Sequence, residues 1–222
     1  KDKVYIFHLI CLGTKYSSAS VIRGKSRNSI LKNILKVWIQ YFGAPRRFLT
    51  DNGGEFSNED FRELCEHFNI VSATTPGESP WSNGVVERHN GILMETVRRT
   101  MDECQCDLET ALPWAISAKN TLSNVSGFSP NILVFGRNPN VPSVLTDSVP
   151  AMEPCSVSEL VRTNLCVMHS ARRSYVAAEA SEKIRRALRM KLRTSNDTVV
   201  NNGDSVFYRR LNSKGWSRYC DR

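Results

Sequence analysis

Hydrophobic positions in the first part of the chain switch between strand and helix patterns. Residues 4–12 (VYIFHLICL) are apolar nearly throughout, which predicts a strand covered on both faces, and residues 17–23 predict a second strand. From Asn28, a predicted N-cap, apolar residues recur at helical spacing until Gly43 and Pro45 end the helix. Strands joined through crossing helices are typical of an α/β sheet.

The same alternation continues through the middle of the chain. The run RRFLT predicts a short strand that ends at Asp51, and residues 57–60 resemble a capping box that opens a helix over about 58–68. Residues 70–73 predict a further strand. The run TTPGESPWSNG, residues 74–84, contains two prolines and two glycines and therefore predicts an irregular loop.

Helical patterns dominate the chain after this loop. Helices are predicted from Val85 to about Glu103 and over 108–122, and a proline-rich stretch then predicts a linker. Residues 156–194 predict a long basic helix, and GDSVFYRR at 203–210 alternates as a strand should. The predicted organisation is a core at 1–137, a linker at 138–155, a basic helical segment at 156–195 and a C-terminal segment at 196–222.

Composition and charge narrow the class of protein. The 222 residues are 41% hydrophobic and 23% charged, as in globular proteins, and no apolar run reaches the roughly 18 residues of a membrane span. Residues 155–222 hold 14 basic and 6 acidic residues, which accounts for the whole net charge of +8. A basic tail favours polyanion binding, although a solvated basic helix would look the same. Seven dispersed cysteines predict reduced thiols inside a cell.

Two carboxylates stand where an α/β fold places functional groups. Asp51 follows a predicted strand, and Glu87 lies on the first turn of the helix after the irregular loop. Two such carboxylates can share divalent metal ions, as phosphoryl-transfer sites do. The alternative is structural, because a DNGG sequence is often only a turn.

Three motifs in order carry a family resemblance: FGAPRRFLTDNGGEF, TTPGESPWSNGVVERHN and FSPNILVFGRNP. They resemble the integrase core of retroviruses and long-terminal-repeat retrotransposons of the gypsy type, over residues 4 to about 137. The resemblance implies a ribonuclease-H-like mixed sheet flanked by helices and a protein that joins element DNA to target DNA. We expect an intracellular protein that is nuclear when bound to DNA. It implies an Asp, Asp, Glu triad that holds two Mg²⁺ or Mn²⁺ ions, with Asp51 as the second Asp and Glu87 as the Glu.

The start of the chain departs from that family pattern. VYIFHLICLGTKYSSASV is similar to the family's second strand, with Cys11 where the family has an Asp that is not a metal ligand. The first Asp of the triad is therefore expected upstream of Lys1, with Asp2 as a weaker alternative. We expect this stretch to be inactive alone because that ligand is absent. The alternative to an integrase fragment is a decayed or host-retained protein, which binds DNA or partners but catalyses no reaction.

The resemblance also points to nucleic-acid contacts. It places Asn83, Arg88 and Asn90 in a loop and helix that contact DNA, and a helix N-terminus favours phosphate. The long helix and the GDSVFYRR strand are similar to a connector and the opening of a small SH3-like β-barrel in gypsy-type relatives, and a homo-oligomer is compatible with the family. Further DNA contacts are expected from the basic residues of the long helix, namely Arg172, Arg173, Arg185, Arg186 and Arg189.

Overall fold

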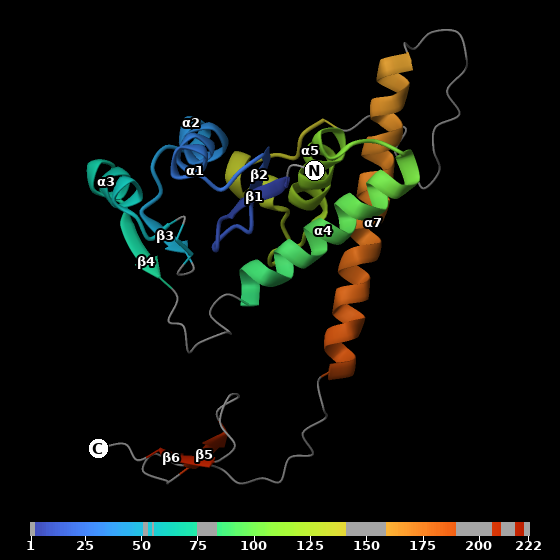
Figure 1. The fold of residues 1–222 in the computed structure, drawn as a ribbon. Helices are drawn as coiled ribbons and strands as arrows, with labels where there is room; N and C mark the ends of the chain where they lie inside the picture. Colours follow the sequence, from blue (N-terminus) through green and yellow to red (C-terminus); the bar gives the residue numbers. More distant parts are fainter. Residues whose placement is uncertain are drawn as a thin grey trace. The chain divides into compact units, whose positions relative to one another are not determined.

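The computed structural model describes residues 3–50, 53–54, 56–74, 84–140, 159–189, 206–209 and 216–219. The chain forms two compact units, Lys1–Ile184 and Arg185–Arg222. Figure 1 shows the order of the elements along the chain within each unit.

Two strands near the start form an antiparallel hairpin. Strand β1 (Tyr5–Ile10) pairs with β2 (Ser17–Ile22), in a register that places Tyr5 opposite Ile22 and Ile10 opposite Ser17. Both predicted strands are confirmed. The turn between them is closed by a hydrogen bond of 2.8 Å from the backbone N–H of Lys15 to the backbone oxygen of Cys11.

A second pair of strands is parallel. Strand β3 (Arg47–Thr50) pairs with β4 (Val71–Thr74), and helix α3 (Glu59–His67) lies between them in sequence, as a parallel pair requires. The prediction of a helix here is confirmed, but its capping box is wrong. The side chain of Asn58, not Ser57, caps α3 by accepting a hydrogen bond of 3.0 Å from the backbone N–H of Phe61.

The helical segment between the two strand pairs has a π-helical centre. It consists of α1 (Arg27–Ile34), the π-helix η1 (Leu35–Ile39) and the short α2 (Gln40–Phe42). The prediction that Asn28 is the N-cap is wrong, because the side chain of Ser26 accepts the capping hydrogen bond from the backbone N–H of Ser29. Gly43 ends the segment with a φ of 72°, a conformation that glycine adopts without steric cost.

One hydrophobic core joins both strand pairs to these helices. Phe7 of β1 and Ile22 of β2 are buried with Ile34 and Phe61, and Phe48 of β3 packs against the same cluster. Within the described residues, β1–β2 and β3–β4 are separate hydrogen-bonded pairs, one antiparallel and one parallel. The expected combination of helices and strands is therefore present, but the described strands form two separate pairs and not the single mixed sheet that was expected.

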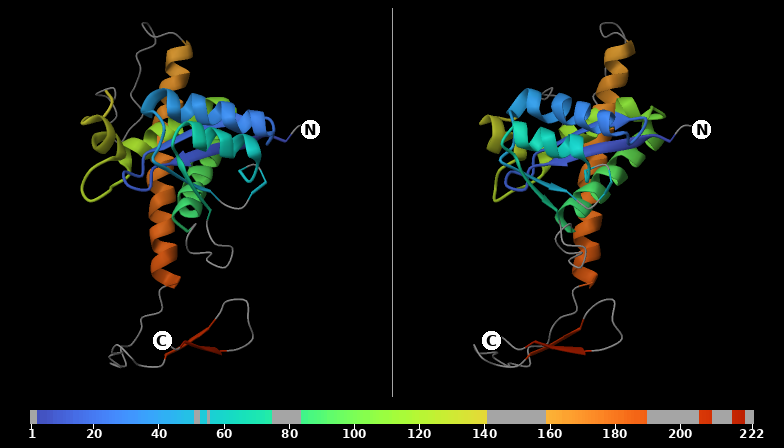
Figure 2. Two further views of the ribbon diagram at one scale, coloured as in Figure 1. Left: turned by 90° about the vertical axis from the view of Figure 1, so that its left-hand side faces the viewer. Right: turned by 60° about the vertical axis from the view of Figure 1, so that its left-hand side comes forward.

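Helices cover the other face of the hairpin as well. Alternation along β1 sends Phe7 to one layer, whereas Ile6 packs with Leu93 of α4 (Gly84–Cys104) and Ala115 of α5 (Leu108–Leu122). Figure 2 shows β1 and β2 between the two groups of helices. This two-sided burial explains why residues 4–12 are apolar nearly throughout.

Two further helices follow, of which the second continues past Ile184, the last residue of the first unit. The short α6 (Pro130–Phe135) was not predicted, although Ser129 caps it and Gly136 ends it in the left-handed conformation. Helix α7 (Glu159–Arg189) confirms the long helix predicted over 156–194, with shorter bounds. Tyr175 and Ala178 of α7 are buried against α4 and α5.

The second unit contains one described hairpin. Strand β5 (Val206–Arg209) pairs antiparallel with β6 (Trp216–Tyr219). The strand expected at 203–210 is therefore present over a shorter range. Among the described residues, no helix is long and apolar enough to cross a membrane.

Candidate metal and nucleic-acid site

Of the two predicted metal ligands, Glu87 lies on a described helix and Asp51 follows a described strand in the sequence. Strand β3 ends at Thr50, so Asp51 is the next residue in the sequence, and Glu87 stands in the first turn of α4. Asp51 itself and Asn83 lie outside the described residues. The predicted position of Glu87 on the first helical turn is confirmed.

Glu87 is an exposed carboxylate. The described part of the chain gives it neither an ion pair nor a side-chain hydrogen bond, whereas the other acidic side chains of α4 are paired with arginine. Carboxylate oxygens of this kind suit Mg²⁺ and Mn²⁺, which prefer oxygen ligands. No group of three or more His, Cys, Asp or Glu residues that could hold a metal occurs among the described residues, so a metal site at Glu87 requires Asp51 or other residues outside that set.

Unpaired buried polar atoms flank both candidate ligands. The hydroxyl of Thr50, directly before Asp51, and Nδ1 of His89, two residues after Glu87, are buried without a hydrogen-bond partner in the described structure. Buried polar atoms are rarely left unpaired, and functional sites are among the exceptions. These two atoms mark the end of β3 and the start of α4 as places where a partner group would be stabilising.

Asn90 and Arg88, the two predicted DNA contacts on α4 that the structure describes, differ in exposure. Asn90 is exposed and Arg88 is half-buried. The side-chain oxygen of Asn90 lies 2.5 Å from Nδ1 of His8, on β1. One of the expected contact residues is therefore tied to the sheet, a link across 82 positions that the sequence alone does not reveal.

This link continues through the hairpin into α5. Nε2 of His8 lies 2.9 Å from the hydroxyl of Ser17. The backbone N–H of Ser17 donates to the side-chain oxygen of Asn120 over 2.9 Å, and the side-chain amide of Asn120 donates to the backbone oxygen of Ser17 over 2.8 Å. The only hint in the sequence is a histidine within an otherwise apolar strand, which has no partner that local spacing could identify.

The interior beside this network disfavours positive charge. Burial is the main cause that lowers the pKa of His8 to about 4, and Lys119 contributes electrostatically. Burial likewise lowers the pKa of Lys119 to about 7, with Lys15 as a further cause. His8 is therefore neutral at physiological pH, and its two nitrogens have distinct roles as donor and acceptor.

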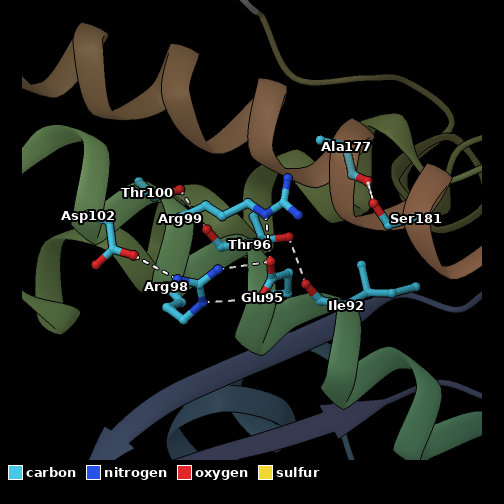
Figure 3. Close-up of polar contacts among 9 residues, drawn as sticks. All are labelled: Ile92, Glu95, Thr96, Arg98, Arg99, Thr100, Asp102, Ala177 and Ser181. Atoms are coloured by element: carbon cyan, nitrogen blue, oxygen red, sulfur yellow. Dashed lines mark hydrogen bonds and ion pairs between the residues drawn. The ribbon is translucent and has the colours of Figure 1, made fainter.

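The outer face of α4 beyond the first turns is a network of ion pairs (Figure 3). Glu95 accepts from Arg98 and from Arg99, and Arg98 also pairs with Asp102. The hydrogen bonds from the two arginines are the main cause that lowers the pKa of Glu95 to about 2. The carboxylate of Glu95 is therefore already paired with arginine, whereas the carboxylate of Glu87 has no ion pair among the described residues.

The predicted basic residues of α7 differ in their surroundings. Arg173 forms an ion pair with Glu103 of α4, whose other carboxylate oxygen accepts from Ser170 over 2.7 Å. Arg172 is half-buried, and burial lowers its pKa. Arg185 and Arg186 are exposed, and the side chain of Arg189 is outside the described structure. The basic residues at 172–173 thus take part in the packing of α7.

The fold and the ordered motifs define the class: this chain is a homologue of the integrase catalytic cores of retroviruses and retrotransposons. A family model described as the TnsB C-terminal domain matches residues 28–103. The Retrovirus-related Pol polyprotein from transposon 412 of Drosophila melanogaster is 34% identical over 139 residues, which are 62% of this chain and 11% of that polyprotein.

Solved structures support the fold. The catalytic core domain of BIV integrase is 25% identical, with a TM-score of 0.50 over 60% of this chain and 86% of that one. A chain of the simian T-cell lymphotropic virus intasome in complex with PP2A regulatory subunit B56 gamma gives a TM-score of 0.53 at 22% identity, over 70% of this chain and 59% of that one. The chain spans about a tenth of the length of the curated relatives that it matches.

Proposed function

We propose that this chain is the catalytic core of a retroelement integrase, which binds DNA and joins element ends to target DNA by strand transfer. The observation that carries the proposal is Glu87, an exposed carboxylate on the first turn of α4, in a chain whose strand β3 ends immediately before Asp51. Homology to integrase cores supports the same function.

Asp51 and Glu87 are the proposed ligands of Mg²⁺ or Mn²⁺, together with an Asp expected upstream of Lys1. When bound, such ions activate the attacking oxygen and stabilise the leaving oxygen of a phosphodiester. The role of the chain itself is to hold the carboxylates at fixed positions. Strand β3 ends directly before Asp51 in the sequence, and the first turn of α4 carries Glu87.

DNA is the proposed partner of the surface around the start of α4. Helix α4 has 21 residues, and a helix N-terminus offers backbone donors and a favourable dipole to phosphate. Asn83, Arg88 and Asn90 are the proposed contacts. Arg185, Arg186 and Arg189 at the end of α7 are proposed to add phosphate contacts that are independent of sequence, with Arg172 and Arg173 as lesser contributors.

The second unit and the assembly of the protein belong to the same proposal. The β5–β6 hairpin is compatible with the opening strands of an SH3-like module. Integration joins two element ends to one target, so a homo-oligomer acting in the nucleus would fit this function.

The decisive experiment compares Glu87→Gln with the wild type in the longest open reading frame that contains residues 1–222. We expect Mn²⁺- or Mg²⁺-dependent joining of a duplex oligonucleotide to plasmid DNA to fall to background, while duplex binding without metal stays within about twofold, because the change removes one ligand oxygen and no phosphate contact. Glu63→Gln, at an exposed position on α3, is the matched control.

Joining by Glu87→Gln at the wild-type rate would contradict the catalytic assignment. A wild-type protein that binds DNA but joins none under any divalent metal would instead favour a non-catalytic DNA-binding protein.

A further inference from the structure

His8 connects the sheet to the part of α4 that carries Glu87. Its ring contacts two elements at once: Nδ1 lies 2.5 Å from Oδ1 of Asn90 on α4, and Nε2 lies 2.9 Å from the hydroxyl of Ser17 on β2. Asn90 follows Glu87 by three residues, which is slightly less than one helical turn. The imidazole therefore contacts a residue about one helical turn after the proposed metal ligand.

The hydrogen bonds determine which nitrogen of His8 carries the proton. An amide oxygen only accepts hydrogen bonds, so Nδ1 is the protonated nitrogen that donates to Asn90. Nε2 is then unprotonated and accepts from the hydroxyl of Ser17. The lowered pKa of His8 agrees with a neutral ring that has one tautomer.

This arrangement also fixes the orientation of the Asn90 amide. Because Oδ1 is turned toward His8, the two donors on Nδ2 are turned away from the ring. Asn90 is exposed, and its Nδ2 has no hydrogen-bond partner among the described residues. A donor group held in one orientation and open to solvent is ready to bind an acceptor oxygen.

The far end of the chain of hydrogen bonds is rigid. Ser17 is fully buried, and both its backbone N–H and its backbone oxygen are held by the side chain of Asn120 on α5. His8 therefore accepts from a hydroxyl whose residue is fixed on two sides. Pairing of both backbone groups at this buried end restricts Ser17 to one geometry.

We propose that His8 is a positioning residue for DNA binding, which holds Asn90 so that its amide donors face a phosphate or base oxygen of DNA next to Glu87. The proposal rests on the proposed function, because it assigns a support to one of the proposed DNA contacts. His8 itself does not touch DNA in this arrangement. It acts only through Asn90, which distinguishes it from a residue that merely fills space between β1 and α4.

The first test is spectroscopic and needs no DNA. Long-range ¹H–¹⁵N spectra of the ¹⁵N-labelled chain distinguish the two neutral tautomers of a histidine. We expect His8 to be in the Nδ1–H form, and we expect Asn90→Ala to change the ring signals of His8. A predominantly Nε2–H ring would reverse the orientation of the Asn90 amide and would overturn the proposal.

The second test is a double-mutant cycle of duplex DNA binding, measured by fluorescence anisotropy with His8→Val, Asn90→Ala and the double variant. We expect each single change to weaken binding about three- to tenfold, the effect of losing one typical hydrogen bond, and the double variant to be no weaker than Asn90→Ala alone. His8→Asn, whose amide can replace the Nδ1 donor, should retain most of the affinity. Thermal melts verify that each variant is folded.

The outcomes separate this proposal from the proposed function. Loss of affinity in Asn90→Ala with wild-type affinity in His8→Val would overturn the role of His8 and leave the DNA-binding function standing. Equal, additive losses would show that His8 acts on its own and would also overturn it. Absence of DNA binding by the wild-type chain would overturn both, whatever the tautomer.

Discussion

The ammonium group of Lys119 donates a hydrogen bond to the backbone oxygen of Lys15 over 2.9 Å, although Lys119 is 0% exposed. This contact joins α5 to the turn between β1 and β2, next to the pair formed by Ser17 and Asn120. Burial and the nearby charge of Lys15 stabilise the charged form of Lys119 less than water would. The pKa of Lys119 is therefore lowered.

We expect the free energy of unfolding to rise between about pH 7 and 10 because of Lys119. Its pKa is lowered to about 7 in the folded protein, so in this window the unfolded chain binds more protons than the folded one. The gain should be of the order of 4 kcal/mol at most. Urea unfolding at a series of pH values measures it.

Lys119→Met is the matched variant for that measurement. Its stability should vary less between pH 7 and 10 than that of the wild type, because the titrating group is gone. A wild-type profile that is flat or falling in this window would contradict the prediction.

Below about pH 6.5, the free energy of unfolding should depend on His8. Its pKa is lowered from 6.5 to about 4 by burial, so on acidification the unfolded chain takes up a proton before the folded chain does. Stability should therefore decrease from about pH 6.5 to about pH 4, by roughly 3 kcal/mol, and then level off with respect to this residue. Chemical unfolding of His8→Asn and of the wild type at a series of pH values tests this prediction. If stability decreases equally in both proteins between pH 6.5 and 4, groups other than His8 cause the decrease.

Asp107 should contribute to stability as the N-cap of α5. Its side chain accepts a hydrogen bond of 2.9 Å from the backbone N–H of Thr110. A hydrogen bond from the Thr110 side chain is the main cause that lowers the pKa of Asp107, and the backbone bond is the next cause. Asp107→Ala should measurably lower the free energy of unfolding, and Asp107→Asn, which retains a capping oxygen, should lower it much less. Equal losses in thermal or urea unfolding would mean that capping is not the relevant contribution.

Two arginines of α7 should differ in the salt dependence of DNA binding. Arg186 is exposed, whereas Arg173 is paired with Glu103. Arg186→Ala should reduce the slope of log affinity against log salt concentration by about 1, and Arg173→Ala should change it less. Anisotropy titrations at several salt concentrations measure both slopes, and a larger effect of Arg173→Ala would show that its ion pair opens on DNA.

Periodicity in the sequence was enough for most elements. The nearly continuous apolar residues of 4–12 predicted a strand with two covered faces, and Ile6 and Phe7 do pack into different layers. The helix predicted at 108–122 has those bounds in the structure. These features depend on which residues alternate along one segment, so they can be read without knowledge of the rest of the fold.

Local competition between similar capping residues was beyond the sequence. Ser26 and Asn58 cap their helices, where Asn28 and Ser57 had been predicted. Each alternative has a side chain that can accept a capping hydrogen bond, so the residue type alone does not distinguish them.

The sequence by itself determined the order of strands and helices, the position of Glu87 on a first helical turn and the motifs shared with integrase cores. Only the tertiary structure decided that His8 meets Asn90 and that Arg173 meets Glu103, pairs separated by 82 and 70 positions. It also decided that Lys119 is buried. The physical reason is that periodicity reports which face of a segment is buried, whereas partners and pKa shifts depend on what the fold brings against that face.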